Sequence, residues 1–391
     1  MAIEAAHVRV VGAGPAGLMA AEVLAAGGAR VNIVDHHANP GRKFLLAGRG
    51  GLNLTHSEPL EIFLTRYGVA RPLLESAIRS FPPDSVRTWC EGLGIKTFVG
   101  SSGRVFPSCM KASPILRAWL RRLGDMGVTL QSGTKWSGFD DNPTILAMGG
   151  ASWPELGSDA AWVETFAKTG VAVVPFMASN SRQIVYWSSH FAKRYAGQPI
   201  KNVAVVAGEK TVRGEVMIAR DGIEGGAIYA QAAALRGGAD LTIDLKPDLS
   251  AVEVERRLSK PRGKGSRSNH LRKVFNLSPA AIALMRETGS ENPKLVRVTT
   301  VGSADLRRAI STAGGIAAHE VDKNFRLKKF PNTWVSGEML DWDAPTGGYL
   351  LQACFSTAVC AARDCLTSLN STYFTAVARQ PSIPGSRPKP P

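Results

Sequence analysis

The chain has 391 residues, of which 44% are hydrophobic, and it carries 40 glycines and 23 prolines. This composition is typical of a globular α/β protein and excludes the fibrous and disordered classes. The formal net charge of +15 favours anionic partners such as a dinucleotide, an acidic substrate, nucleic acid or a membrane surface.

The N-terminal segment predicts one βαβ unit. Residues 8–12 and 30–35 read as buried strands, and residues 15–27 read as the helix between them. The connecting turn follows the pattern GxGxxG, in which the first glycine permits a tight turn, the second lets the backbone approach a pyrophosphate, and the third lets helix and strand pack closely. The predicted dinucleotide contacts in this turn are Gly12, Gly14, Pro15, Ala16 and Gly17.

A carboxylate closes the second strand of this unit. Asp35 lies eighteen residues after Gly17 and is predicted to accept hydrogen bonds from ribose hydroxyls. His36 and His37 follow it and are predicted to flank the adenosine pocket. The unit alone does not choose between NAD and FAD.

Residues 39–58 are rich in glycine and arginine and predict a loop on the cofactor side. Backbone N–H groups and cationic side chains in such a loop can bind phosphate or the carbonyl oxygens of a flavin. An NAD dehydrogenase would more often place its next helix here, so the loop favours FAD. The candidate cofactor contacts are Arg42, Lys43, Gly48, Gly50 and Asn53, and Arg49 is a weak candidate for a catalytic role.

Residues 59–128 are predicted to be largely helical, with breaks at Phe81-Pro82-Pro83 and in a turn-rich segment near residues 100–108. Residues 144–150 predict a strand that runs into a double-glycine turn. Residues 171–175 predict another strand, ending in proline. The candidate cofactor contacts here are Ala147, Gly149 and Gly150.

An inserted substrate domain is predicted at residues 176–302, between a first part of the FAD domain at 1–175 and a second part at 303–379. Short β-like runs at 203–207 and 239–245 precede a helical stretch between 248 and 288. The densest basic segment, residues 260–273, is predicted to be either a solvated loop or an anion or RNA contact.

The C-terminal segment carries a third cofactor signal. A strand-like run from residue 332 reaches Gly337 and Glu338, and the carboxylate is expected to contact ribityl hydroxyls. A double-glycine turn then opens a helix predicted to reach about Leu366, where N–H groups can face the flavin N1–C2=O edge. The remaining candidates are Asp341, Thr346, Gly347, Gly348 and Tyr349, the last also a weak catalytic candidate. Residues 380–391 carry five prolines and predict a disordered tail.

Together these motifs resemble a bacterial family of FAD-dependent, aminoacetone-oxidase-like flavoproteins, some of which are linked to the reduction of dehydro bile acids. The resemblance covers nearly the whole chain and implies a Rossmann-like α/β FAD domain, interrupted by a β-rich substrate domain with a small helical part. Its marks include the segments at 12–17, 41–55, 147–154, 311–315 and 337–349.

The sequence departs from the family pattern at three places. Met148 stands where such flavoproteins often carry threonine, and Leu350 stands where many relatives carry asparagine. Only nine residues separate Trp136 from Leu146, where relatives usually have a longer β-hairpin. A lid beside the FAD domain is therefore expected to be short, which would weaken folding or cofactor affinity.

Other chemistries lack their signatures. Residues 36–89 contain no cysteine for a disulfide reductase, no second GxGxxG unit offers a dedicated NAD(P)H domain, and the seven histidines are scattered, so no metal site is expected. NAD(P)H is expected to dock transiently, or an organic substrate reduces the flavin and oxygen reoxidises it.

The sequence thus predicts a cytoplasmic FAD-dependent oxidoreductase that transfers a hydride between flavin N5 and a small or medium organic substrate. The alternatives are a flavoprotein that binds or modifies tRNA, and a silent paralogue that binds flavin without turnover. Nucleic acid is not the favoured partner because the basic residues are dispersed, and no membrane span is expected. Neither the substrate nor a catalytic acid or base can be read from the sequence.

Overall fold

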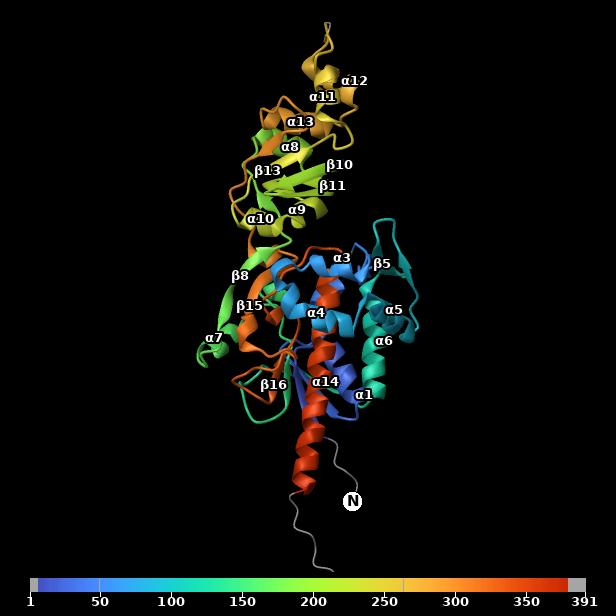
Figure 1. Ribbon diagram of the computed structural model, residues 1–391, viewed down its shortest axis with the longest axis vertical. Coiled ribbons are helices and arrows are strands. Elements are labelled where there is room, and N and C mark those ends of the chain that lie inside the picture. The colour runs from blue at the N-terminus through green and yellow to red at the C-terminus, as the bar shows by residue number, and fades with distance from the viewer. Residues whose placement is uncertain (1–5, 49, 263, 379–391) are drawn as a thin grey trace, which may run out of the picture.

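The computed structural model describes residues 6–48, 50–262 and 264–378. The predicted tail at 380–391 and Arg49 lie outside the described residues. The chain ends combine in one lobe, and the middle of the chain forms a second lobe at the other end of the long axis (Figure 1). The predicted α/β class, a Rossmann-like domain with an inserted β-rich domain and a small helical part, is confirmed.

A parallel sheet organises the first lobe. Its five strands run in the order β16-β7-β1-β2-β6, and every neighbouring pair is parallel. The strands are β1 (His7–Val11), β2 (Arg30–Asp35), β6 (Thr129–Ser132), β7 (Thr144–Leu146) and β16 (Thr333–Val335). The predicted N-terminal unit is confirmed, because α1 (Pro15–Ala26) connects β1 to β2. Ligands of such sheets bind beyond the carboxyl ends of the strands.

Helices cover this sheet. The helix α14 (Tyr349–Ala378) packs beside α1, and Gly27 allows the approach because a Cβ there would lie 2.4 Å from a methyl group of Leu366. The helix was predicted to reach only about Leu366. The other helices of the lobe are α2 (Arg42–Ala47), α3 (Leu60–Thr65), η1 (Gly68–Ala70), α4 (Arg71–Ser80), α5 (Pro83–Gly92), α6 (Ala112–Asp125), η2 (Pro154–Leu156), α7 (Trp162–Ala167), η4 (Ala318–Glu320) and η5 (Gly337–Met339).

The prediction of a loop over residues 39–58 is wrong in part. Helix α2 forms there because Gly41, at φ +66°, turns the chain, and because Phe44 is buried with its ring edge against Trp119 of α6. The strand β3 (Thr55–His56) follows it. Both elements are too short to give a clear hydrophobic period.

A small antiparallel sheet replaces part of the predicted helical region. The strands β4 (Thr97–Val99) and β5 (Arg104–Pro107) form a hairpin, and β3 adds to it in the order β3-β5-β4. Phe98 and Phe106 face each other across the hairpin with ring centroids 5.8 Å apart. Such cross-strand aromatic pairs stabilise short hairpins.

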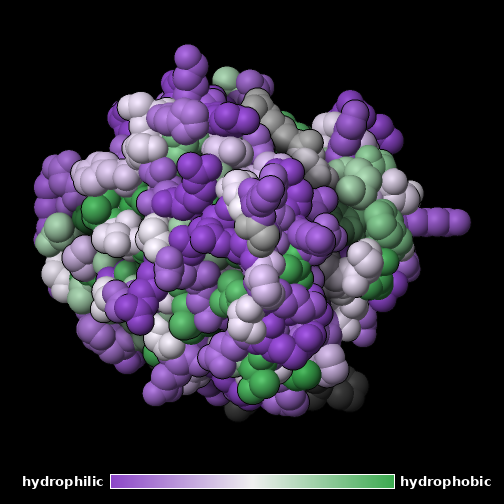
Figure 2. Space-filling view, turned by 90° about the horizontal axis from the view of Figure 1, so that it is seen from above, coloured by the Kyte–Doolittle hydropathy of each residue, from purple (hydrophilic) through white to green (hydrophobic). Residues whose placement is uncertain are grey.

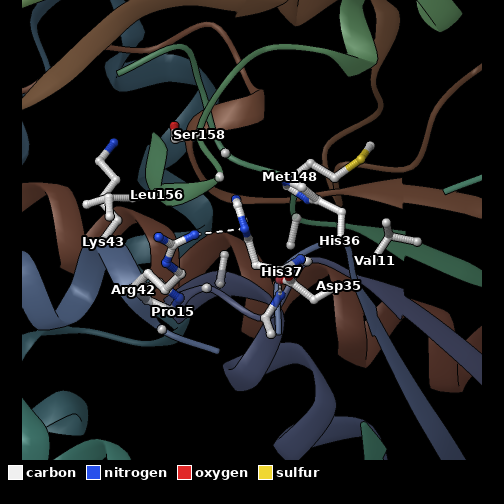
Figure 3. A pocket seen from close by; sticks show the side chains of 18 of the residues that line it. Val11, Pro15, Asp35, His36, His37, Arg42, Lys43, Met148, Leu156 and Ser158 are labelled. Atoms are coloured by element: carbon white, nitrogen blue, oxygen red, sulfur yellow. Dashed lines mark hydrogen bonds between the residues drawn. The ribbon is translucent and has the colours of Figure 1, made fainter. Parts of the chain in front are cut away.

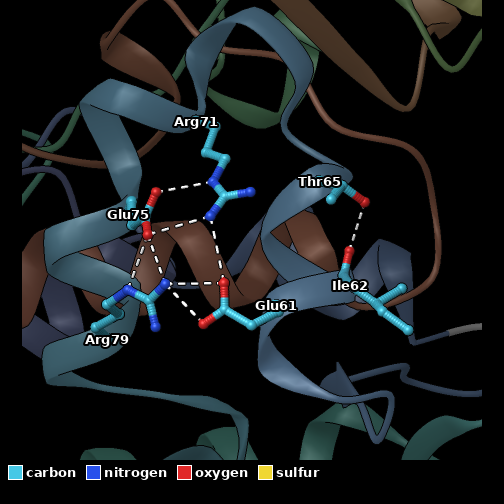
Figure 4. Close-up of polar contacts among 6 residues, drawn as sticks. All are labelled: Glu61, Ile62, Thr65, Arg71, Glu75 and Arg79. Atoms are coloured by element: carbon cyan, nitrogen blue, oxygen red, sulfur yellow. Dashed lines mark hydrogen bonds and ion pairs between the residues drawn. The ribbon is translucent and has the colours of Figure 1, made fainter.

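Charged side chains connect α3 to α4 on the surface. Glu75 accepts hydrogen bonds from Arg71 and Arg79, and both arginines also reach Glu61 (Figure 4). These bonds lower the pKa of Glu75 to about 2. Because exposed ion pairs contribute little to stability, the network fixes the helix geometry more than it stabilises the fold.

The second lobe contains a six-stranded antiparallel sheet in the order β14-β13-β10-β11-β12-β9. Its strands are β9 (Gln183–Ile184), β10 (Pro199–Ala207), β11 (Lys210–Ala219), β12 (Gly222–Glu224), β13 (Leu241–Asp244) and β14 (Val296–Val298). The predicted β runs at 203–207 and 239–245 are confirmed. Its helices are α8 (Ser189–Tyr195), α9 (Gly226–Tyr229), α10 (Ala232–Arg236), α11 (Ala251–Leu258), α12 (Arg267–Phe275) and α13 (Pro279–Glu287).

Two long strands lie between the lobes. The strand β8 (Val173–Ser179) pairs antiparallel with β15 (Ser311–Ile316). The strand predicted to end at Pro175 therefore continues to Ser179, because Pro175 tolerates an extended backbone. The short helix η3 (Leu306–Arg308) precedes β15.

Candidate functional site

The glycine turn after β1 is shaped by close backbone packing. Gly12 has φ +104°, and a Cβ there would lie 2.3 Å from the carbonyl oxygen of Ala147. A Cβ at Gly17 would lie 1.8 Å from the carbonyl oxygen of Gly12. These two glycines are therefore required by the protein's own packing, as the motif predicts.

Gly14 behaves differently from its neighbours. A Cβ built on it meets no protein atom within 4 Å, and its φ of −83° is open to any residue. It precedes Pro15, the first residue of α1. The unpaired backbone N–H groups of the first turn of this helix lie at the same end. The protein fold itself does not demand glycine here, and the bare backbone leaves room for a ligand to approach it.

Asp35 ends β2 beside this turn. Its Oδ2 accepts a hydrogen bond from the backbone N–H of Ala13 at 2.6 Å, and its Oδ1 accepts one from that of His37 at 2.8 Å. The carboxylate thus fixes the turn against the strand end. Each oxygen keeps a lone pair that can accept a bond from a ribose hydroxyl.

His37 connects β2 to the short helix α2. Its Nδ1 lies 2.7 Å from a guanidinium nitrogen of Arg42, so it acts as the acceptor and the ring is neutral (Figure 3). Burial, the neighbouring His36 ring and the Arg42 cation lower the pKa of His37 below its ordinary value. The sequence predicted that both His36 and His37 flank the adenosine pocket, and both line the same pocket.

The far end of the pocket holds a partly buried polar bridge. The Lys43 ammonium donates to Glu338 at 2.5 Å and to the hydroxyl of Ser152 at 2.7 Å. The bridge thus connects α2, η5 and the turn after β7. Lys43 and Glu338 are 295 positions apart in the sequence. Their contact agrees with the prediction that both segments lie on the cofactor side.

Most of these residues line one pocket at the carboxyl ends of β1, β2 and β7. Of the sequence candidates, those that line it are Gly12, Gly14, Pro15, Ala16, Asp35, His36, Arg42, Lys43, Ala147, Gly149 and Glu338. The lining residues that the sequence did not single out include Trp136, Leu156, Ser158 and Cys354. They belong to no motif, and only the three-dimensional arrangement reveals them.

The other candidates lie outside this lining. Gly17, Gly150 and Gly337 allow close packing behind it, where a Cβ would meet Gly12, Thr312 and Ala16 respectively. Those on the loop after α2 and at the start of α14 are Gly48, Gly50, Asn53, Thr346, Gly347, Gly348 and Tyr349.

Asn53 and Tyr349 have contrasting surroundings. Both polar side-chain atoms of Asn53 are buried without a hydrogen-bond partner among the described residues. The Tyr349 hydroxyl instead donates to Glu58 at 2.7 Å, and burial and this bond raise its pKa. The Asn53 amide therefore keeps its hydrogen-bonding capacity, whereas the Tyr349 hydroxyl already donates its hydrogen bond to Glu58.

A second cavity opens between the two lobes. Asp341, one of the sequence candidates, lies on its wall rather than in the first pocket, and burial raises the pKa of its carboxyl. Arg236 of α10 pairs with Asp343 at 2.5 Å and donates to the carbonyl oxygen of Ala178. Both lobes contribute to this cavity, with Tyr67, Trp342, Lys210 and Tyr229 among the lining.

The segment between β6 and β7 contains no strand. Arg9 holds it through an ion pair with Asp140 at 2.7 Å, and Phe139 stacks on Phe330. The short connection agrees with the expectation of a reduced lid. Trp136, which belongs to the same segment, lines the first pocket.

The described residues contain neither a candidate membrane span nor a candidate metal site. No helix there is long and apolar enough to cross a membrane. No group of three or more histidine, cysteine or acidic side chains in that part of the chain is arranged to hold a metal ion.

The orphaned atoms and open backbone fit a dinucleotide with a polar ring system. Gly14 and the α1 N-terminus leave room for a pyrophosphate, and the Asp35 oxygens suit a ribose. Ser158 and Ser336 also line the pocket with buried hydroxyls that lack a partner among the described residues. The donors and acceptors of the pocket therefore fit the phosphate and ribose groups of a dinucleotide.

Comparison with known proteins points the same way. The model of the HI0933-like protein Rossmann domain matches residues 6–364. The chain is 24% identical to the ribosomal RNA dihydrouridine synthase of Escherichia coli (strain K12), covering 93% of this chain and 98% of that protein. It is 22% identical to the 3-dehydro-bile acid delta(4,6)-reductase of Clostridium scindens, covering 91% and 98%. A flavocytochrome c3 fumarate reductase in its open conformation has the same fold, with a TM-score of 0.52 and 15% identity over 93% of this chain and 78% of that chain.

Proposed function

Because the chain belongs to the HI0933-like protein Rossmann domain family, we propose that it is an FAD-dependent oxidoreductase that reduces an organic substrate. The membership confirms the resemblance drawn from the motifs. One observation carries the proposal: Gly14 borders open space at the N-terminus of α1, in a pocket whose other walls carry Asp35, Arg42 and Lys43.

Different residues of the chain bind the different parts of the cofactor. The turn at Gly14 and the start of α1 hold the pyrophosphate, and Asp35 with His36 hold the adenosine half. Lys43, Glu338 and Asn53 hold the ribityl and flavin half, through a cation, a carboxylate and an amide. Bound FAD would supply hydride chemistry at flavin N5, while the protein binds and orients the reactants.

The cavity between the lobes is proposed to receive the organic substrate. It is built partly from Gly314 and Asp341, in segments that the motifs assign to the flavin side, and partly from the inserted domain. Arg236 is a positioning residue there, because its pair with Asp343 joins the two lobes. Closing the cavity would exclude water from the reacting atoms.

Reduction is the favoured direction. The names of both curated relatives describe the addition of hydrogen to an organic molecule, a dihydro product in one and a reductase in the other. We therefore propose NADPH or NADH as the electron donor, docking transiently, since the sequence has no second GxGxxG unit.

An oxygen-free visible spectrum of the purified protein tests these points. The flavin bands are expected to bleach on addition of NADPH or NADH and to return when an organic acceptor is added. Bands that persist with both nicotinamides would show that an organic substrate supplies the electrons, and the direction would be wrong. A colourless protein that fails to take up added FAD would overturn the proposal.

A second candidate is that the reduced group is a base within RNA. The net charge of +15 favours a polyanionic substrate, and one curated relative is named for ribosomal RNA. Mass spectrometry of RNA incubated with the reduced protein would detect the addition of two hydrogen atoms. An unchanged RNA mass, with an active small-molecule reductase, would exclude this candidate.

A further inference from the structure

The helical tip of the inserted domain is strongly and uniformly basic. Residues 256–286 contain nine lysines and arginines and no aspartate or glutamate. They span the end of α11, all of α12 and most of α13, which lie together at the extreme end of the second lobe (Figure 1). Arg257 holds two of these helices together by donating to the carbonyl oxygen of Val274 at 3.1 Å.

Most of these cations lack acidic partners. Arg256 and Arg257 pair with Glu253, and Arg267 pairs with Glu291. The other six are exposed and have no ion pair among the residues that the structure describes: Lys260, Arg262, Lys264, Arg272, Lys273 and Arg286. A structural role would place carboxylates beside them, so the tip presents an uncompensated positive surface.

The acidic groups around the tip do not cancel this charge. Glu253 and Glu291 are already paired, and Glu287 accepts hydrogen bonds from the backbone N–H and hydroxyl of Ser188. Glu255 is exposed on α11 and is the one remaining carboxylate on these helices among the described residues. The six unpaired cations therefore dominate the local potential.

The chemistry of the tip fits a nucleic-acid backbone. Figure 2 looks onto this end of the molecule and shows a largely hydrophilic surface with only scattered apolar side chains. On α11–α13, Val252 is the only exposed large hydrophobic residue among those described, and Phe275 is buried. A membrane surface would require apolar side chains to insert, and base recognition would require exposed aromatic rings.

From this arrangement we infer that the tip formed by residues 256–286 binds the phosphate backbone of RNA without reading its sequence. Lysine and arginine contacts to phosphates position a nucleic acid and release counterions. The inference rests on the second candidate function only for the choice of RNA as the partner. RNA binding itself requires no flavin chemistry and is measured independently of it.

The test compares two quadruple variants of the full-length protein. The tip variant is Lys260→Gln, Arg262→Gln, Lys264→Gln and Arg272→Gln. The control removes the same charge from exposed cations of the first lobe that have no ion pair among the described residues: Arg30→Gln, Lys96→Gln, Arg117→Gln and Arg121→Gln. Fluorescence anisotropy with a labelled single-stranded RNA of about 20 nucleotides measures Kd over a range of salt concentrations.

The tip variant is expected to bind at least about tenfold more weakly, with a salt slope (log K against log salt) smaller by about 3, whereas the control keeps nearly wild-type affinity. Equal losses in both variants would show a general charge effect and overturn the inference. So would binding to phosphatidylserine vesicles without binding to RNA. Flavin absorbance, measured on the same samples, reports separately on the proposed cofactor chemistry.

Discussion

At the scale of single residues, Gly14 separates ligand binding from folding. Gly14→Val adds a side chain to a position that the apoprotein leaves open, at a φ that valine adopts readily. We expect FAD affinity to fall at least about tenfold, because the side chain fills the space that a pyrophosphate needs, while the apoprotein melts within about 2 °C of wild type. Fluorescence titration with FAD and thermal unfolding measure the two effects.

Two glycine substitutions complete that comparison. Gly124→Ala lies in α6, where a Cβ also meets nothing within 4 Å, and should leave FAD affinity unchanged. Gly17→Ala should destabilise the fold, since its Cβ would clash with the Gly12 carbonyl group. If Gly14→Val kept full FAD affinity, the turn would not hold the pyrophosphate.

His37 predicts a pH dependence at the same pocket. Its pKa is lowered in the folded protein, so the unfolded chain binds the proton more readily and the folded state loses stability as the pH falls below the ordinary value of 6.5. Protonation also removes the acceptor for Arg42. Wild type is expected to lose more stability between pH 7 and about 5.5 than His37→Gln, because glutamine does not titrate in this range.

Denaturant unfolding at the two pH values measures that difference. His319→Gln is the matched control, because this histidine is exposed and remote from the pocket. Identical pH slopes for wild type and His37→Gln would contradict the assignment of His37 as a neutral acceptor.

Local patterns explain which residues could be predicted. The roles of Gly12 and Gly17 follow from a motif whose geometry is set within thirty residues, and both contacts are found. Tyr349 and Asp341 were grouped with the cofactor by their neighbours in sequence, yet the structure binds one to Glu58 and places the other at the second cavity. Side-chain direction depends on tertiary partners, which a linear pattern does not contain.

At the scale of elements, one carboxylate anchors the long helix α14. Asp364 accepts hydrogen bonds from Asn324, Arg326 and the indole N–H of Trp334 on β16. Asp364→Ala would leave these half-buried donors unsatisfied and is expected to lower the unfolding free energy by about 2–4 kcal/mol. The neighbouring Arg363→Ala serves as control, because its single bond to the carbonyl oxygen of Ser80 is exposed and long at 3.4 Å.

Chemical denaturation of the two variants gives the comparison directly. A loss below about 0.5 kcal/mol for Asp364→Ala, equal to that of the control, would show that water replaces the carboxylate at no cost. A loss of about 2–4 kcal/mol would instead show that Asp364 contributes substantially to the anchoring of α14.

Element prediction succeeded where the hydrophobic pattern was long. The strands β1 and β2, the helix α1 and the helices of residues 248–288 follow from sustained periods and Ser caps at positions 250, 266 and 278. The helix α2 and the hairpin of β4 and β5 were missed because each has only three to six residues. Their stability comes from burial against α6 and from aromatic pairing rather than from local propensity.

At the scale of the whole molecule, the described residues form three hydrophobic clusters, two in the first lobe and one in the inserted domain. One core draws on both chain ends, from Val8 to Cys365, whereas the core of the inserted domain lies wholly between Val185 and Val298. The two segments that join the lobes run side by side, because the N–H of Ala304 donates to the carbonyl oxygen of Arg182 at 2.8 Å. The sequence predicted such an insertion because its pattern changes to short β-like runs followed by a helical stretch. That the two ends of the insertion lie side by side is seen only in the structure.

This adjacency predicts that the two parts fold separately. Residues 183–302 expressed alone are expected to unfold in one cooperative transition, since their core and six-stranded sheet are complete. Joining Arg182 to Ala304 by a short glycine linker should give a remainder that still takes up FAD, because the first pocket has no wall from residues 183–302. That remainder should lose substrate reduction, because Lys210, Tyr229 and Arg236 are removed from the second cavity. The control fragment 183–250 lacks β14 and should stay unfolded. If the remainder aggregated without flavin, the inserted domain would be needed to assemble the two ends of the chain.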